Sequence, residues 1–160
     1  MAREGADISI VYLPKVEDAQ DTKKMVEKVG RRAYLMALDL RESENCRRVV
    51  EEHMKAFGKL SVLVNNSAMQ EICNDIRDIN LNVVGKTYRM DILSMFAMCK
   101  FALPHMKRGA SIINSCPVAA RIDNPQLVDY PSTKVAIVTF TRSLAQQAPN
   151  GITLMLLRPA

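Results

Sequence analysis

The sequence predicts an α/β fold built on a parallel β-sheet. Short apolar runs alternate along it with amphipathic stretches whose apolar residues recur about every 3.6 positions, which is typical of strands joined by helices. The chain has 160 residues, of which 48% are hydrophobic and 24% are charged, as in an ordinary globular protein. We therefore expect one α/β unit with a substantial core.

The first half of the chain predicts three strands separated by two helices. The strands are expected at residues 8–12, 33–38 and 61–64. Between the first two, an apolar stripe closes at Gly30, and between the next two a stripe ends at Gly58, both typical of helix C-termini. His53 lies on the second stripe, so we expect it to pack against neighbours rather than bind a metal.

The second half predicts two further strands and two helices. The strands are expected at 111–114 and 152–157, and one helix at 134–147. A long helix over 91–106 is apolar on most of its faces, which indicates burial in the domain or against another subunit. Residues 69–88 show no clear pattern.

Composition excludes several classes of function. The net charge of +5 comes from basic pairs spread along the chain, and aromatic residues make up only 5%, so we expect no nucleic-acid partner. Apolar runs are shorter than the roughly 18 residues of a membrane span, and the charged N-terminal residues predict no secretion signal. Scattered cysteines and two isolated histidines predict a cytoplasmic protein without a metal site.

A tyrosine and a lysine four residues apart form the pair with the clearest chemistry. Tyr130 and Lys134 lie at the start of a predicted helix, where this spacing puts both on one face. A neighbouring ammonium favours phenolate and lowers the tyrosine pKa from about 10. Such a tyrosine can give a proton to a carbonyl oxygen, or take one from an alcohol, while a hydride moves. The same spacing is also common in ordinary surface packing.

Other motifs accompany this pair in a fixed order. Asp39-Leu40 follows the second predicted strand, and Asn65-Asn66-Ser67-Ala68 follows the third. Tyr130 opens the phrase Tyr-Pro-Ser-Thr-Lys. Further matching phrases are at 58–64, 111–114 and 141–145. Together they resemble the short-chain dehydrogenase/reductase family over nearly the whole chain.

The resemblance implies a doubly wound, Rossmann-like parallel sheet that binds NAD or NADP. It implies that Asp39 accepts a hydrogen bond from the adenine amino group, with the Leu40 backbone beside it. Asn65 and Asn66 would shape the turn under the cofactor ribose, and Ser67 would be a further cofactor-binding residue there. The whole chain would then be a partial dinucleotide-binding domain.

The resemblance also assigns the chemistry and the partners. Tyr130 would be the proton donor, and Lys134 would hold the nicotinamide ribose and lower the tyrosine pKa. The end of the strand at 8–12 offers no acidic residue for a ribose 2′-hydroxyl, which favours NADP over NAD. The expected substrate is a small carbonyl compound or alcohol, and a homo-oligomer would form through helix 91–106.

The family's phosphate-binding front end has no counterpart here. Members open with a strand and a Gly-rich turn that holds the pyrophosphate, whereas the six glycines of this chain are dispersed. We therefore expect an incomplete fold that lacks the first strand and the Gly-rich loop. That strand is central in the order 3-2-1-4-5-6, so the strands at 8–12 and 61–64 must close up in a new register or leave backbone groups unpaired.

Two active-site positions also depart from the family. Pro117 stands where members carry a serine, and Asp91 stands where they carry an asparagine, which replaces an amide by a carboxylate without N–H donors. Two hypotheses follow. One is an NADP-dependent oxidoreductase; the other is a non-catalytic relative or truncated fragment that acts in subunit association.

Overall fold

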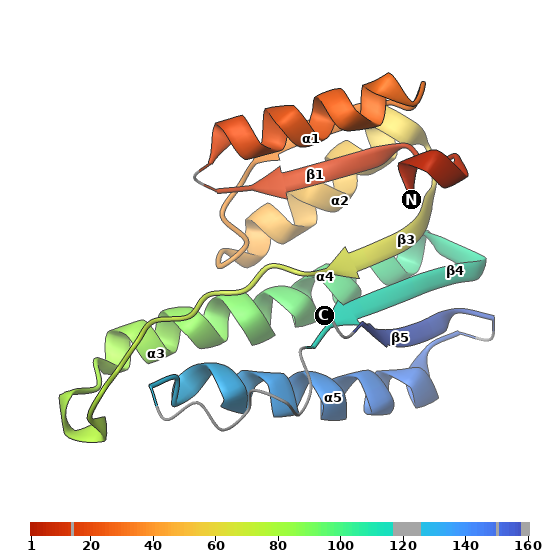
Figure 1. Cartoon of the computed structure of the whole chain (residues 1–160). Coiled ribbons are helices and arrows are strands. Elements are labelled where there is room, and N and C mark those ends of the chain that lie inside the picture. Colours follow the sequence, from red (N-terminus) through yellow and green to blue (C-terminus); the bar gives the residue numbers. More distant parts are fainter. Residues whose placement is uncertain (14, 117–125, 150, 158–160) are drawn as a thin grey trace.

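Strands and helices alternate along the chain, which confirms the predicted α/β class (Figure 1). The computed structural model describes residues 1–13, 15–116, 126–149 and 151–157. The strands are β1 (Ile8–Tyr12), β2 (Ala33–Ala37), β3 (Leu60–Asn65), β4 (Met106–Ser115) and β5 (Thr153–Leu157). The helices are α1 (Val16–Lys28), α2 (Ser43–Phe57), α3 (Leu81–Tyr88), α4 (Ser94–Ala102) and α5 (Asp129–Gln147). A π-helical turn, Arg89–Leu93, joins α3 to α4.

The strands form two parallel sheets rather than one. β1 pairs with β2, and β3, β4 and β5 pair in that order. The resulting sequence of strands, β2-β1 and then β3-β4-β5, reproduces the Rossmann order 3-2-1-4-5-6 with the central position left open. The fold is therefore an incomplete Rossmann-like sheet without the first strand and its Gly-rich loop.

The sequence left two possibilities for β1 and β3: they could pair with each other in a new register, or stay apart with unpaired backbone groups. The structure shows the second. These strands run in the same direction on either side of the gap in Figure 1, and no ladder joins them. The pairs β1-β2 and β3-β4 are thus kept, and the edges of β1 and β3 that face the gap have no neighbouring strand among those described. The physical reason is packing: α2 contacts β2, β3 and α4, so moving β1 onto β3 would disrupt the helices that bridge the two sheets.

Helices α2, α4 and α5 form one layer on the strands, and α1 packs separately on β1 and β2 (Figure 1). The core between this layer and the strands is apolar and includes Cys46, Val50, Met95, Cys99, Ala102 and Ile112. On the described strands β3 and β5, several apolar side chains remain exposed, namely Val62, Val64, Met155 and Leu157. No helix in the described part of the chain is long and apolar enough to cross a bilayer.

The region 69–106 differs from the sequence-based prediction. Residues 69–88, left unassigned, contain α3, which begins after Asn80, whose side chain accepts a hydrogen bond from the Asn82 amide. The predicted helix 91–106 is not continuous, because the π turn, α4 and a 3₁₀ turn share its length, and Met106 already belongs to β4. Pro104 in that 3₁₀ turn explains the early end of α4, since proline cannot continue the hydrogen bonding of a helix.

His53 is a packing residue, and its environment makes stability depend on pH. Its Nε2 lies 2.9 Å from the Lys59 carbonyl oxygen, so Nε2 carries the proton, and Nδ1 accepts from Ser9 Oγ at 2.8 Å. Burial lowers the pKa of His53 below its usual value near about 6.5. As the pH falls, His53 is protonated more readily in the unfolded chain than in the folded chain. The free energy of unfolding therefore decreases from its value above pH ~6.5 as the pH falls toward the pKa of the folded state.

We accordingly expect the free energy of unfolding to be lower at pH 5.5 than at pH 7.5. Urea unfolding of the wild type and of His53→Gln at both values measures the effect. The difference between the two pH values should shrink in the variant. An equal acid loss in His53→Gln would show that another group is responsible.

Candidate functional site

Tyr130 and Lys134 lie beside a buried carboxylate. Lys134 Nζ donates to Asp91 Oδ2 at 2.8 Å, and the two side chains are 4% and 0% exposed. The same oxygen accepts from Thr133 Oγ1 at 2.8 Å, while Asp91 Oδ1 accepts from the Met69 amide at 2.8 Å. The carboxylate is therefore held by three donors from two parts of the chain, α5 and the segment after β3, and it compensates the charge of a lysine that water cannot reach.

Local structure positions this group of side chains. Helix α5 begins at Asp129, five residues earlier than predicted, and Asp129 Oδ1 accepts from the Tyr130 amide at 2.8 Å. Lys134 lies one turn after Tyr130 on α5, and its carbonyl oxygen accepts a hydrogen bond from the thiol of Cys116, just after β4, at 3.3 Å. Asp91 comes from the π turn, a distortion frequently found at functional sites. The end of β4, the start of α5 and the π turn thus meet at one place.

The tyrosine ring lies directly against the lysine. Lys134 Nζ is 4.4 Å from the centroid of the half-buried Tyr130 ring. Burial, followed by the negative charge of Asp91, raises the pKa of Tyr130 above its usual value. This direction is opposite to the lowering that the Tyr-Lys spacing alone suggests, because burial and the negative charge of Asp91 both disfavour phenolate.

Asn65 has a structural role in the sheet. Its side-chain amide donates to Asn114 Oδ1 at 2.8 Å, and Asn114 Nδ2 donates to Thr141 Oγ1 at 2.9 Å. This chain of hydrogen bonds ties β3 to β4 and β4 to α5, and Asn114 and Thr141 are buried. Buried polar side chains need such partners, so the amide of Asn65 is committed to the scaffold.

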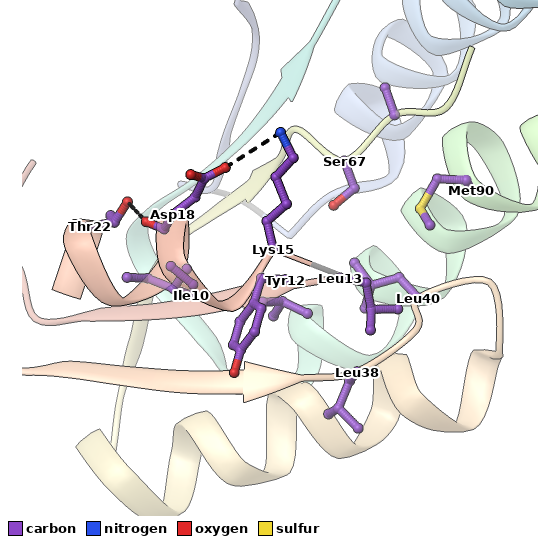
Figure 2. A pocket seen from close by; sticks show the side chains of 13 residues that line it. Ile10, Tyr12, Leu13, Lys15, Asp18, Thr22, Leu38, Leu40, Ser67 and Met90 are labelled. Carbon is purple, nitrogen blue, oxygen red and sulfur yellow. Dashed lines mark hydrogen bonds and ion pairs between the residues drawn. The ribbon is translucent and has the colours of Figure 1, made fainter. Parts of the chain in front are cut away.

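A pocket of about 430 Å³ lies where β1, β2 and β3 end (Figure 2). Ligands of open α/β sheets bind at the carboxyl ends of the strands, at the point where the strand order reverses. Of the predicted cofactor residues, Leu40 and Ser67 line this pocket, together with the apolar side chains of Leu38 and Met90. Its lining is thus mainly apolar, and the polar side chains in it are Tyr12, Lys15, Asp18, Thr22 and Ser67.

Asp39 and Asn66 stand outside that lining. The Arg41 guanidinium donates to both oxygens of Asp39, with Nη2 2.6 Å from Oδ2, and this contact holds the pKa of that carboxyl below its usual range. Asn66 is exposed. Tyr130 and Lys134 belong to the neighbouring buried group rather than to the pocket, and Pro117 lies outside the described residues.

Lys15 is a pocket residue that the sequence reasoning missed. It lines the hollow from the start of α1, and its Nζ is 3.9 Å from Asp18 Oδ2 (Figure 2). Its position three residues after β1, at the carboxyl end of a predicted strand, was the available signal. A cation there complements the absence of an acidic residue at the end of β1.

These features define a class of protein: a Rossmann-like α/β domain with a Tyr/Lys pair near a pocket at the carboxyl ends of its strands. The description "short chain dehydrogenase" belongs to a family model that matches residues 1–160. The chain therefore belongs to the short chain dehydrogenase family, as its motifs indicated, and is related to oxidoreductases.

Curated relatives agree with this assignment. The chain is 43% identical over 159 residues to the uncharacterized oxidoreductase YhdF of Bacillus subtilis, covering 99% of this chain and 55% of the relative. It is 42% identical over 158 residues to NADPH-dependent aldehyde reductase 1, chloroplastic, of Arabidopsis thaliana, covering 94% and 55% respectively. The chain thus spans about half the length of the curated relatives it matches.

Solved structures show the same fold. A short chain dehydrogenase from Burkholderia cenocepacia in complex with NADP superposes with a TM-score of 0.93 at 28% identity, covering 99% of this chain and 65% of that one. A blue fluorescent protein from a metagenomic library, in complex with NADPH, gives a TM-score of 0.91 at 27% identity, covering 99% and 66%. The superpositions include both sheets, so the sheets lie relative to each other as in longer members of the fold.

Proposed function

We propose that the chain is an NADP-dependent oxidoreductase domain that reduces a small carbonyl compound or oxidises an alcohol, with Tyr130 as the proton donor. The observation that carries this proposal is the half-buried Tyr130 ring lying 4.4 Å from the Lys134 ammonium at the carboxyl end of β4. A phenol in that position is suited to exchange a proton with a substrate oxygen. Membership of an oxidoreductase family supports the same reaction class.

The residues of the chain fit one half of the cofactor well. The apolar side chains of Leu38, Leu40 and Met90 suit an adenine ring, and Ser67 offers a hydroxyl at the edge of the same pocket. Lys15 supplies a cation that suits the 2′-phosphate of NADP. The six glycines of these 160 residues are dispersed, so the fit described here concerns the adenosine half of the cofactor and not its pyrophosphate. NAD remains the alternative cofactor.

The cofactor would supply or accept the hydride, and the protein handles the proton. For reduction, Tyr130 Oη gives its proton to the substrate oxygen, and water then returns a proton to the phenolate. Thr133 and Asp91 hold Lys134 in place beneath the ring. The residues therefore provide orientation and a single proton donor.

The setting we propose is the cytoplasm. Burial raises the pKa values of the Cys46 and Cys99 thiols to about 11, so both are protonated, unreactive core residues. Thiols of this kind suit a reducing compartment.

A second proposed role, subunit association, has its own support. Leu93 at the end of the π turn and Phe96 on α4 are 54% and 50% exposed, and Val135 on α5 is 54% exposed. The Phe96 ring also packs against Phe140 of α5 at 4.1 Å between centroids. An apolar surface across two helices suits a second copy of the chain. Light scattering of the wild type and of Phe96→Glu would test this role, since only the wild type should form a dimer.

The catalytic proposal is tested by following the loss of NADPH absorbance with a panel of small aldehydes and ketones. We expect turnover of at least one carbonyl compound, faster with NADPH than with NADH. No turnover with any substrate and either cofactor would overturn the proposed activity and leave association as the remaining function.

A further inference from the structure

The Lys134 ammonium lies between the phenol that it could ionise and a carboxylate that neutralises its charge. On one side is the Tyr130 ring, 4.4 Å away, and on the other is Asp91 Oδ2, at 2.8 Å. Both charged side chains are almost fully buried. In this environment the ammonium and the carboxylate together present no net charge to the phenol, and the screening by water that weakens exposed charges is missing.

We propose that Asp91 is a positioning residue that neutralises Lys134, so that Tyr130 stays a protonated phenol at neutral pH and serves the reductive direction of hydride transfer. The proposal rests on the proposed function of Tyr130 as the proton donor. It adds what that function leaves open, which is the direction and the pH range in which the site operates.

The geometry makes the carboxylate a fixed part of the site rather than an occasional contact. Two of its three donors, Lys134 and Thr133, lie on α5, and the third is the Met69 amide in the segment after β3. Thr133 Oγ1 also lies 2.8 Å from the Tyr130 carbonyl oxygen, which places the acid next to the turn that carries the tyrosine. The ammonium is thereby directed at Asp91, and it is not free to turn fully toward the phenol oxygen.

The titratable groups that face Tyr130 also favour a protonated phenol. They are Lys134 on its own helix, Asp91 on the π turn and the Cys116 thiol after β4. Burial, Asp91 and Cys116 all act to raise the pKa of the phenol, in that order. At neutral pH the tyrosine therefore carries the proton that a carbonyl oxygen needs. Oxidation of an alcohol requires phenolate, so it should require alkaline pH.

Reduction of a carbonyl needs one hydride and one proton, and Tyr130 together with a reduced cofactor accounts for both. When bound, a reduced nicotinamide dinucleotide would supply a hydride, with its electron pair, to the carbonyl carbon and would itself become oxidised. The carbonyl π bond breaks, and the oxygen takes the proton from Tyr130 Oη. The products are an alcohol and a phenolate, which regains a proton from water.

The test is a pH titration of the tyrosines by NMR, with ¹³C at Cζ, in the whole chain without added ligand. The sequence has four tyrosines, and Tyr130→Phe identifies the resonance of interest. In the wild type we expect Tyr130 to titrate above about 10. In Asp91→Asn, which keeps the shape and the acceptor for the Met69 amide, we expect the pKa of Tyr130 to be lower than in the wild type, because the negative charge that opposes phenolate is gone.

Asp7→Asn is the matched control, because Asp7 also forms ion pairs, with Arg31 and Arg32, but at the far end of β1. It should leave the Tyr130 titration unchanged. If Asp91→Asn does not fold, Asp91→Ser removes the same charge. A Tyr130 titration that is the same with and without Asp91, or one well below 9 in the wild type, would overturn the proposal. Since no turnover is needed, this result is independent of the reductase assay.

Discussion

Replacing Lys134 by methionine should lower the free energy of unfolding by about 3–5 kcal/mol, because it leaves the carboxylate of Asp91 buried without a compensating charge. For a chain of this size the melting temperature would fall by roughly 10 °C. The cause is desolvation of the remaining charge. A fully buried ion pair contributes little net stability, whereas a buried charge without its partner is strongly destabilising. Thermal unfolding at neutral pH measures the effect.

The double variant Asp91→Asn/Lys134→Met separates this cause from simple loss of packing. Asparagine still accepts from the Met69 amide, and neither buried position then carries a charge. We expect the double variant to be more stable than Lys134→Met alone. Additive losses from the two substitutions would instead mean that the charges do not interact in the folded chain.

Replacing Tyr130 by phenylalanine should reduce carbonyl reduction by about 10² to 10⁴-fold, which is the usual contribution of a positioned proton donor. Phenylalanine preserves the ring that lies over Lys134 and removes only the hydroxyl. The change should therefore leave the fold intact while removing the proton. Steady-state NADPH oxidation with the best substrate of the panel measures it.

Tyr88→Phe provides the control for this experiment. Tyr88 lies on α3, and its hydroxyl forms a hydrogen bond with Ser132 Oγ at 2.7 Å, close to the same helix start. It should retain most of the turnover, because its hydroxyl is committed to packing of α3 on α5. Turnover that survives in Tyr130→Phe would show that another group supplies the proton.

Most of the alternating strands and helices could be predicted because local patterns determine them. The stripe on α2 ends at Gly58, which has φ of 72°, a left-handed conformation that glycine adopts without strain. The open central position of the sheet also followed from the strand order, since β1 and β3 flank the family's first strand. The pattern could not decide between re-pairing and separation, because that choice depends on how α2 packs across both sheets.

The parts that could not be predicted depend on contacts between distant residues. Asp91 stands where the family has an asparagine, but its pairing with Lys134 spans 43 residues and cannot be read from local sequence. Burial and the Asp91 charge then raise the Tyr130 pKa, where the Tyr-Lys spacing predicts a lower one. The π turn that presents Asp91 has no signature of its own in the local sequence, which alternates charged and apolar residues. Lys15 escaped notice because one lysine in a basic chain carries no information until the pocket is seen.

The most direct measurement for the central claim, that this domain binds NADP, is a thermal melt with and without NADPH, repeated with NADH. At about 100 times its dissociation constant, a ligand of the folded state adds about 2.7 kcal/mol of stability. We predict a cooperative transition that rises by roughly 5–10 °C with NADPH and by less with NADH, a difference that Lys15→Ala should reduce. A melting temperature unchanged by either cofactor would contradict the claim.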